Sequence, residues 1–384
     1  MDYGKREAAQ PAMLVGRQEV GELLPVVAAS RLVTLVGAPG VGKTRVAREV
    51  IERVRQQASF DTGFVDLAIV GHPDLVPTAM ACQLGLRVRP QQSAIDALID
   101  SVGDREMVAV LDHAGHVLRG CQELITALRH ARSALRVVVT SSEAIGAAEE
   151  VVWRVAPLPA ADAADLFAAR IRQVGGSPLT DENQHVIDQL CRRLAGLPGA
   201  MELAAARVGA MPLREVHDSI MECFRRLLGS AHQRVREEHI ALLAVAWSHR
   251  LCSESAYLLL RRLAVFRGAF TVDAARTVAW DDAGNGFDRA LAELVATALI
   301  GVEQRRGACR YRLPNAVREY AAEKLSASGE AHTIFGRHSD YYTRPGERFT
   351  DLLAGTPTDW QASDWANVTA SIDWKSEPAE GMNG

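Results

Sequence analysis

Glycine, lysine and threonine gather between residues 37 and 44, where the sequence reads Gly-Ala-Pro-Gly-Val-Gly-Lys-Thr. Glycines let a backbone turn tightly enough for its N–H groups to face phosphate oxygens. In such a loop the lysine reaches the β- and γ-phosphates, and the threonine hydroxyl coordinates Mg²⁺. The spacing therefore predicts a site for ATP or ADP with Mg²⁺, formed by Gly37, Ala38, Pro39, Gly40, Val41, Gly42, Lys43, Thr44 and Arg45.

This chemistry requires a strand before the loop and a helix after it. Residues 31–36 are an apolar, β-branched run, and apolar residues recur on one helical face from Val46 to Val54. The N-terminus of that helix adds unpaired N–H groups and the positive end of its dipole to the phosphate site. A glycine-rich turn that binds nothing is the alternative, and the complete motif in its proper context disfavours it.

Asp112 ends a second apolar run, residues 107–112. An apolar strand that delivers a carboxylate beside the phosphate loop is the pattern that holds Mg²⁺ in nucleotide-binding proteins. We therefore predict Thr44 and Asp112 as magnesium ligands, and Lys43 and Asp112 as the candidate catalytic residues. An ordinary aspartate at a strand end is the alternative.

The elements around these residues alternate in type. Strands are predicted at 63–67, 107–112, 135–142 and 150–155, with helices predicted at 74–84 and 94–102 between the first two of these. This alternation predicts a parallel α/β sheet with ligands at the carboxyl ends of its strands. The extra strand between the phosphate-loop strand and the acid-bearing strand predicts the strand order 5-1-4-3-2.

Beyond residue 157 the signals are helical only, as far as about residue 228. Helices and a β-hairpin then follow between 232 and 325, which predicts a winged-helix domain. The fold class is thus an α/β P-loop NTPase domain followed by an all-α helical domain, a winged helix and a short helical C-terminal region. The predicted division is a flexible tail at 1–12, a nucleotide-binding domain at 13–156, a helical domain at 157–231, a winged-helix domain at 232–327, the start of a helical repeat-like region at 328–376 and a disordered tail at 377–384.

Composition excludes several classes of protein. The chain has 384 residues and a formal net charge of −4, so no overall basic charge indicates nucleic-acid binding. Its six cysteines are scattered without a Cys-x-x-Cys pair, which indicates reduced thiols and a cytoplasmic protein rather than a disulfide scaffold or zinc site. The sequence contains no signal peptide and no apolar run long enough to span a membrane, so no membrane partner is expected.

The order of the motifs resembles a known family. Val-Gly-Arg at 15–17, the phosphate loop, Val-Leu-Asp-His at 110–113, Val-Thr-Ser-Ser-Glu at 139–143, Gly-Leu-Pro at 196–198 and Arg-Tyr-Arg-Leu-Pro-Asn at 310–315 are similar to bacterial STAND-class ATPases of the NB-ARC type. These ATPases occur in actinobacterial LuxR-type and related transcriptional regulators. The resemblance covers about residues 13–374.

The resemblance implies that ADP is held between the first three domains and that exchange for ATP opens the protein for assembly or signalling. It implies that Val15, Gly16 and Arg17 lie near the adenine and ribose, and that Pro198 packs on the adenine. The chain also departs from the family. Gly115 stands where the family has a glutamate, Ser142 where it has an arginine, and Pro314 where related proteins have a histidine that touches phosphate.

Each departure removes a group that would sense or turn over the γ-phosphate, and no acid follows Asp112 to act as a base. We therefore predict an ADP/ATP-binding switch in signalling or transcriptional regulation, with weak or absent hydrolysis. A slow but genuine ATPase that uses Glu143 or Asp66 as the base is one alternative. A non-enzymatic protein-interaction scaffold is another alternative, so the sequence does not decide whether the protein hydrolyses ATP.

Three other features of the sequence do not identify a binding partner. Arginines crowd the predicted wing and could touch DNA phosphates, although an unidentified protein partner or self-association is the favoured interaction. His113 and His116 have a metal-ligand spacing, with a solvent-facing loop as the favoured alternative. The last helices are interpreted as a truncated repeat array, as segments docked on the winged helix, or as a partner surface. The wing arginines are Arg305, Arg306, Arg310 and Arg312.

Overall fold

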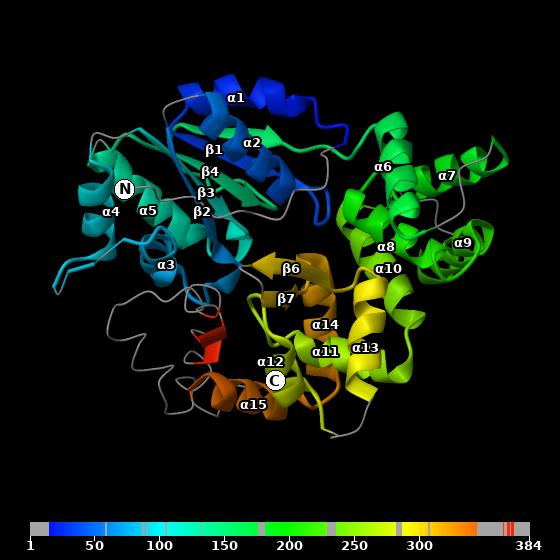
Figure 1. Ribbon diagram of the computed structural model, residues 1–384. Coiled ribbons are helices and arrows are strands. Elements are labelled where there is room, and N and C mark those ends of the chain that lie inside the picture. Colours follow the sequence, from blue (N-terminus) through cyan, green and yellow to red (C-terminus); the bar gives the residue numbers. More distant parts are fainter. Residues whose placement is uncertain are drawn as a thin grey trace.

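The computed structural model describes residues 15–371, apart from 58–59, 87, 90, 104–105, 132, 176–180, 229–235, 282–285, 306–307, 344–363, 365–366 and 369. Figure 1 shows three bodies in contact: an α/β unit, a helical unit beside it, and a third unit of helices with a hairpin against both. The tails predicted at 1–12 and 377–384 lie outside the described residues. The predicted domain boundaries stay predictions.

Five parallel strands form the sheet of the first unit. They are β1 (Leu32–Val36), β2 (Asp61–Asp66), β3 (Met107–Asp112), β4 (Leu135–Ser141) and β5 (Glu150–Arg154). Their order is β2-β3-β4-β1-β5, which confirms the predicted order. The central strands β1, β3 and β4 are buried almost throughout, because helices cover both faces of a parallel sheet.

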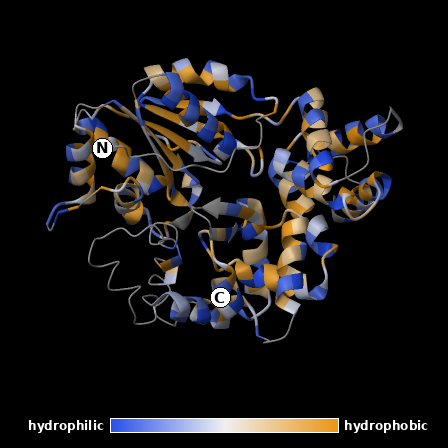
Figure 2. Cartoon of the chain, viewed as in Figure 1, coloured by the Kyte–Doolittle hydropathy of each residue, from blue (hydrophilic) through white to orange (hydrophobic). Residues whose placement is uncertain are grey.

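Helices pack on the two faces of this sheet (Figure 1). They are α1 (Glu19–Ala29), α2 (Lys43–Gln57), α3 (Val76–Gln83), α4 (Ala94–Val102) and α5 (Leu118–His130), with short 3₁₀ turns η1 (Leu67–Ile69), η2 (Pro73–Leu75) and η3 (Ala114–His116). Along β3, Val108 and Val110 join one hydrophobic core, whereas Ala109 and Leu111 join a second core on the other face. This period of two gives the sheet two apolar faces, which Figure 2 shows as orange strands.

The second unit is helical. It consists of α6 (Ala160–Gln173), α7 (Asp181–Arg193), α8 (Pro198–Val208) and α9 (Leu213–Leu228). Helix α8 packs against α6 and α9, and also against α10 (Glu237–Arg250), the first helix of the third unit. The buried residues of α8 lie on most sides of the helix, so α8 is a central helix that joins the two units.

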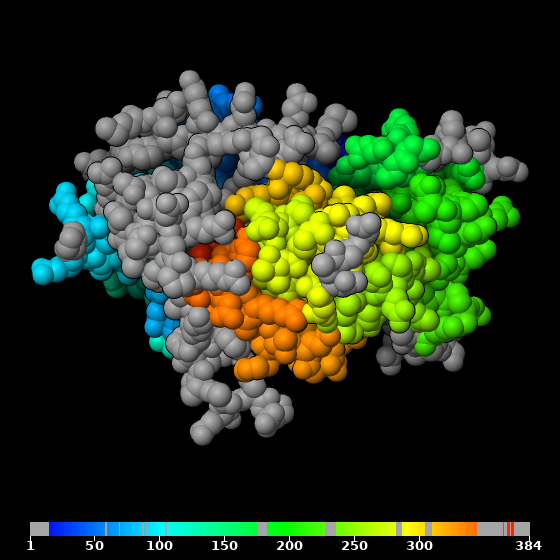
Figure 3. Space-filling view, turned by 60° about the horizontal axis from the view of Figure 1, so that its bottom comes forward, coloured from blue at the N-terminus to red at the C-terminus, as the bar shows by residue number. Residues whose placement is uncertain are grey.

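The third unit has the helices and hairpin of a winged helix. After α10 come α11 (Glu254–Leu263), α12 (Val272–Ala279), α13 (Gly286–Ala296), the antiparallel strands β6 (Gly301–Arg305) and β7 (Ala308–Arg312), α14 (Asn315–Ala327) and α15 (Ala331–Thr343). Side chains of Ser253 and Thr271 cap the first turns of α11 and α12. In Figure 3 the atoms of this unit lie directly against those of the helical unit.

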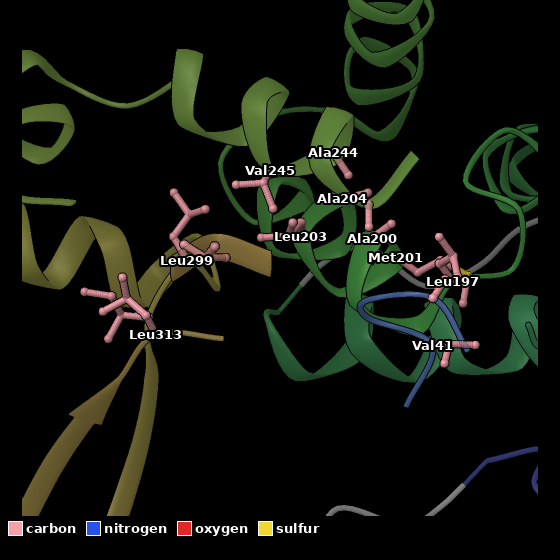
Figure 4. Packing of buried hydrophobic residues seen from close by; sticks show 14 of the residues in the cluster. Val41, Leu197, Ala200, Met201, Leu203, Ala204, Ala244, Val245, Leu299 and Leu313 are labelled. Atoms are coloured by element: carbon pink, nitrogen blue, oxygen red, sulfur yellow. The ribbon is translucent and has the colours of Figure 1, made fainter. Parts of the chain in front are cut away.

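One hydrophobic core runs through all three units. Figure 4 shows Val41 of the phosphate loop beside Leu197 and Met201 at the start of α8, and farther along Ala204 beside Ala244 of α10. Burial of apolar side chains is favourable, so this shared core stabilises the contact of the phosphate loop with the helical unit and the third unit.

The described residues after α15 contact the third unit. Asn367 is fully buried, and its Oδ1 accepts hydrogen bonds from the backbone N–H groups of Arg267 and Gly268 at 3.1 and 3.3 Å. Arg310 forms a two-pronged pair with Asp364, with N–O distances of 3.0 and 2.9 Å. The chain therefore returns to the winged-helix unit near residue 364.

Candidate functional site

The phosphate loop joins β1 to α2, which begins at Lys43. Gly40 and Gly42 have φ angles of 77° and 105°, a backbone region that side-chain-bearing residues rarely adopt. The Lys43 Nζ donates to the carbonyl oxygens of Gly37 and Ala38 at 2.7 and 3.0 Å. Burial lowers the pKa of Lys43 to about 8. The loop thus holds its own ammonium group over the position where the motif places phosphate.

Thr44 and Asp112 lie side by side next to this loop. The Thr44 Oγ1 donates to Asp112 Oδ1 at 2.9 Å, and Thr140 Oγ1 of β4 donates to the same oxygen at 2.5 Å. The Asp112 side chain is only 1% exposed, and a buried carboxylate needs hydrogen-bond donors. The two threonine hydroxyls supply them and hold the carboxylate in place. A hydroxyl and a carboxylate oxygen are hard ligands that suit Mg²⁺, so the two predicted metal ligands fit that ion.

His113 occupies a place that the sequence reasoning missed. Its Nδ1 lies 3.0 Å from Asp66 Oδ1 and 3.2 Å from Asp112 Oδ2, and its Nε2 lies 3.4 Å from Thr44 Oγ1. The His113 side chain is 20% exposed, so the favoured prediction of a solvent-facing loop was wrong for this residue. The signal that could have found the cluster is the pairing of β2 with β3, which sets Asp66 opposite Asp112.

The His113–His116 pair does not form a metal site. His116 Nε2 lies 2.8 Å from the carbonyl oxygen of Val70, away from the Asp66 carboxylate that His113 contacts. Burial lowers the pKa of His116, which favours the neutral ring. Among the residues that the structure describes, the side chains grouped so that they could hold a metal are instead those of Asp66, Asp112 and His113, whose ligand atoms lie within 4.8 Å of one another.

Asp66 carries a charge within this cluster. Burial alone would raise the pKa of Asp66, but Arg312 and His113 outweigh that effect and hold its pKa well below the usual range. Arg312 comes from β7 of the winged-helix unit, and its Nη2 lies 2.5 Å from Asp66 Oδ2. Asp66 is therefore an ionised carboxylate held between two units, which disfavours its use as a free base.

The Val-Gly-Arg segment braces the phosphate loop. Arg17 donates to the carbonyl oxygens of Val41 and of Ala156, the latter at 2.7 Å, and pairs with Glu19 at 2.8 Å. A Cβ on Gly16 would lie 2.3 Å from the Cβ of Asp162 in α6, so only glycine fits this contact. Val15 packs on the hydrophobic core. The location of these residues near adenine and ribose stays a prediction.

Pro198 starts α8 next to the phosphate loop. The following N–H, on Gly199, donates to the carbonyl oxygen of Gly40 at 2.9 Å, and a Cβ on Gly199 would lie 3.1 Å from Gly40 Cα. The helical unit thus contacts the phosphate loop backbone to backbone (Figure 4 shows the adjacent Val41). The packing of Pro198 on adenine stays a prediction.

Two of the three positions that depart from the family pattern lie next to each other, after β3 and β4. A Cβ on Gly115 would meet Ser142 Oγ at 3.3 Å, so these two positions are neighbours although they follow different strands. Glu143, the other suggested base, is exposed at the tip after β4. Pro314 is exposed and precedes the first residue of α14.

Two of the four wing arginines are used inside the protein. Arg310 pairs with Asp364 and Arg312 with Asp66. The side chain of Arg305 and the whole of Arg306 lie outside the described residues. Two of the wing's positive charges are therefore neutralised by intramolecular carboxylates.

These features define a class of protein: a P-loop ATPase fold joined to a winged helix. Residues 252–326 match the winged helix-turn-helix domain family. PH0952 of Pyrococcus horikoshii, a Signal Transduction ATPase with Numerous Domains (STAND) that carries a tetratricopeptide repeat sensor, matches with a TM-score of 0.55 and 13% identity. The match covers 98% of this chain and 52% of PH0952, and at this identity it shows the fold alone.

Relatives of higher identity come from mycobacteria. Rv0894 of Mycobacterium tuberculosis, an uncharacterized protein, is 39% identical over 339 residues, which are 87% of this chain and 86% of Rv0894. The chain belongs to the Rv0894 family. Rv0890c of the same organism, a proposed HTH-type transcriptional regulator, is 39% identical over 325 residues, but these are 83% of this chain and 36% of Rv0890c. Among the helices of the described residues, none is long and apolar enough to cross a bilayer.

Proposed function

We propose that the protein is a STAND-type switch of the NB-ARC kind that binds ADP or ATP with Mg²⁺ and acts in signalling or transcriptional regulation. The observation that carries this proposal is that the helical unit contacts the phosphate loop and the winged-helix unit contacts the carboxylate cluster beside it. Gly199 of the helical unit contacts Gly40, and Arg312 of the winged-helix unit contacts Asp66 beside Asp112. A nucleotide at this loop would therefore bias the arrangement of the units, which is what a switch requires.

The same geometry supports slow turnover. His113 follows Asp112 where an efficient ATPase would carry an acid, and Ser142 stands where the family resemblance implies an arginine that would stabilise developing charge. A slow ATPase is the second candidate. One contact favours it: His113 lies with Nδ1 against Asp66 and with Nε2 toward Thr44, so Asp66 would act through the imidazole rather than directly.

A role in regulation is proposed from the relatives. Rv0890c is much longer than this chain, so its named role as a regulator is transferred only as a proposal. Helix α13, the third helix of the matched winged-helix domain, carries Asp288 and Glu293 against Arg289, which does not suit contact with phosphate. We therefore favour a protein partner or self-association in the cytoplasm over direct DNA reading.

The test is nucleotide carry-over with a matched lysine control. Purified protein is denatured and its supernatant is separated by anion exchange, and binding of fluorescent ADP is titrated with and without Mg²⁺. We expect bound ADP in the wild type, loss of binding in Lys43→Ala, and no change in Lys324→Ala, whose side chain lies on α14. Absence of bound and titratable nucleotide in the wild type would contradict the switch and favour the scaffold.

Hydrolysis is tested separately by single-turnover assay with Mg-ATP. Conversion comparable to that of an efficient ATPase would refute slow turnover. Slow conversion that disappears in His113→Asn, with nucleotide affinity unchanged, would select the slow ATPase. No conversion in the wild type would leave the switch as a binding protein alone.

A further inference from the structure

Arg312 connects the winged-helix unit to the end of β2. Its side chain is 20% exposed and that of Asp66 is 17% exposed, so the ion pair between them is largely shielded from water. In Figure 1 the hairpin of β6 and β7 extends from the third unit toward the sheet. Helix α14 adds a second contact nearby, where Arg318 Nη1 lies 3.5 Å from the carbonyl oxygen of Ala68.

A chain of contacts continues from Arg312 to the phosphate loop. Arg312 meets Oδ2 of Asp66, and Oδ1 of Asp66 meets Nδ1 of His113 at 3.0 Å. The same Nδ1 lies 3.2 Å from Asp112 Oδ2, while Asp112 Oδ1 accepts from Thr44. Each link is a direct side-chain contact, so the winged-helix unit is connected to both predicted magnesium ligands.

Apart from Arg312, this cluster has the composition of a metal site. Two carboxylates and one imidazole suit Mn²⁺ and the later divalent ions of the first transition row. The separations of 3.0 and 3.2 Å from His113 Nδ1 match the edge of about 3 Å between adjacent ligands of a six-coordinate ion. An ion held there would use Asp112 Oδ2 and would compete for Asp112 with the Mg²⁺ of a nucleotide.

Arg312 supplies a fixed positive charge at that place. Burial alone would lower the pKa of Arg312, but the carboxylates of Asp66, Glu303 and Asp112 together outweigh burial, so the guanidinium stays charged. One charged guanidinium already neutralises Asp66, and a second cation beside it would be repelled in a site shielded from water. The negative charge of Asp66 is therefore balanced by Arg312 without a metal ion.

We propose that Arg312 is a positioning residue of the nucleotide site: it occupies Asp66 in place of a metal ion and so reserves Asp112 and Thr44 for the Mg²⁺ of the nucleotide. The proposal rests on the proposed function for its Mg²⁺ part, whereas its metal-excluding part concerns the protein alone. It also makes the docked winged-helix unit a condition for correct Mg²⁺ binding, because Arg312 reaches Asp66 only from that unit.

The hairpin offers a matched control. Arg310 lies two residues before Arg312 on β7, on the same face of the strand, and is 8% exposed. It forms an ion pair of similar burial, but its partner Asp364 belongs to the C-terminal segment. Loss of Arg310 therefore removes a comparable hairpin charge pair without touching the Asp66 cluster.

The first measurement is Mn²⁺ binding to nucleotide-free full-length protein by electron paramagnetic resonance. We expect Arg312→Ala to bind one Mn²⁺ per chain, and the wild type, Arg310→Ala and Arg312→Lys to bind none at the same concentrations. Arg312→Ala/His113→Asn should lose the site, because its nitrogen ligand is gone. If the alanine variant folds poorly, Arg312→Gln replaces it in the comparison, because glutamine removes the charge, fills more of the space and should bind the same single Mn²⁺.

The second measurement is the affinity for ADP in Mg²⁺ and in EDTA. Arg312→Ala should weaken Mg-ADP binding by about tenfold, the scale of a lost outer-sphere partner, and leave the EDTA value unchanged. Arg310→Ala should change neither. If Arg312→Ala gains no Mn²⁺ site, or binds Mg-ADP as Arg310→Ala does, the proposal is wrong. If no variant binds nucleotide while the Mn²⁺ result holds, the proposed function fails and the metal-excluding role of Arg312 stands.

Discussion

Two buried threonines on neighbouring strands should respond oppositely to the same substitution. Thr140 on β4 and Thr34 on β1 are 1% and 0% exposed. Thr140 Oγ1 donates to Asp112 and accepts from the His113 N–H at 2.9 Å. Thr34 Oγ1 has no hydrogen-bond partner within the described part of the chain. Replacement by valine keeps the shape of the side chain and removes only the hydroxyl.

The expected magnitudes follow from these partners. Thr140→Val removes a hydrogen bond to a charged acceptor and leaves a backbone N–H unpaired, which together should destabilise the fold by about 3 kcal/mol. Thr34→Val removes a buried hydroxyl whose burial is uncompensated, which should stabilise the fold by about 1 kcal/mol. The two changes in stability differ in sign because only Thr140 has hydrogen-bond partners, since the two threonines are equally buried and undergo the same substitution.

Hydrogen exchange detected by mass spectrometry tests this locally. Peptides that cover β1 and β4 should exchange faster in Thr140→Val and more slowly in Thr34→Val than in the wild type. Urea unfolding of the full chain gives the same order of midpoints. Equal destabilisation by both substitutions would refute the reasoning, because it would mean that burial, and not hydrogen bonding, decides the outcome.

Three further outcomes are expected. The lowered pKa of Lys43 places its loss of charge near pH 8, so the affinity for ADP should fall about tenfold per pH unit above 8, whereas Lys43→Arg should show a flat profile to pH 10. Burial lowers the pKa of His249 to about 4, so the unfolded chain binds the extra proton between pH 6.5 and 4 and stability falls as the pH drops. His249→Phe should remove up to about 3 kcal/mol of that acid loss, and equal urea midpoint shifts from pH 7 to 4 in both proteins would refute it. A Cβ on Gly120 would lie 2.1 Å from the Pro73 carbonyl oxygen, so Gly120→Ala should cost about 1–3 kcal/mol, measured as a fall in Tm; Gly21→Ala, with open space around it, should not.

Much of the fold could be predicted from local patterns. The five strands and their order followed from apolar runs and from the position of the extra strand, because a parallel sheet leaves continuous buried runs in the sequence. Helix α5 was not predicted, although Cys121, Leu124, Ile125 and Leu128 recur on its buried face at helical spacing. The helical pattern of this segment is therefore present in the sequence.

The site was predictable only in part. Thr44 and Asp112 were assigned together, and the structure places their side chains in contact, because both belong to motifs of fixed geometry. The roles of Asp66, His113 and Arg312 could not be inferred in this way. Their meeting depends on the register between β2 and β3 and on the docking of a hairpin more than 200 residues along the chain, and neither leaves a local pattern.

The closeness of Gly115 and Ser142 bears on how this chain could change by mutation. The resemblance to STAND-class ATPases implies a glutamate and an arginine at these two positions, and side chains of opposite charge at neighbouring positions compensate each other. Both positions are exposed, so a glutamate or an arginine placed there alone would stay hydrated and cost the fold little. Each position can therefore be substituted singly without harm to the fold, and the closeness of the two positions changes the local charge beside the phosphate site more than it changes stability.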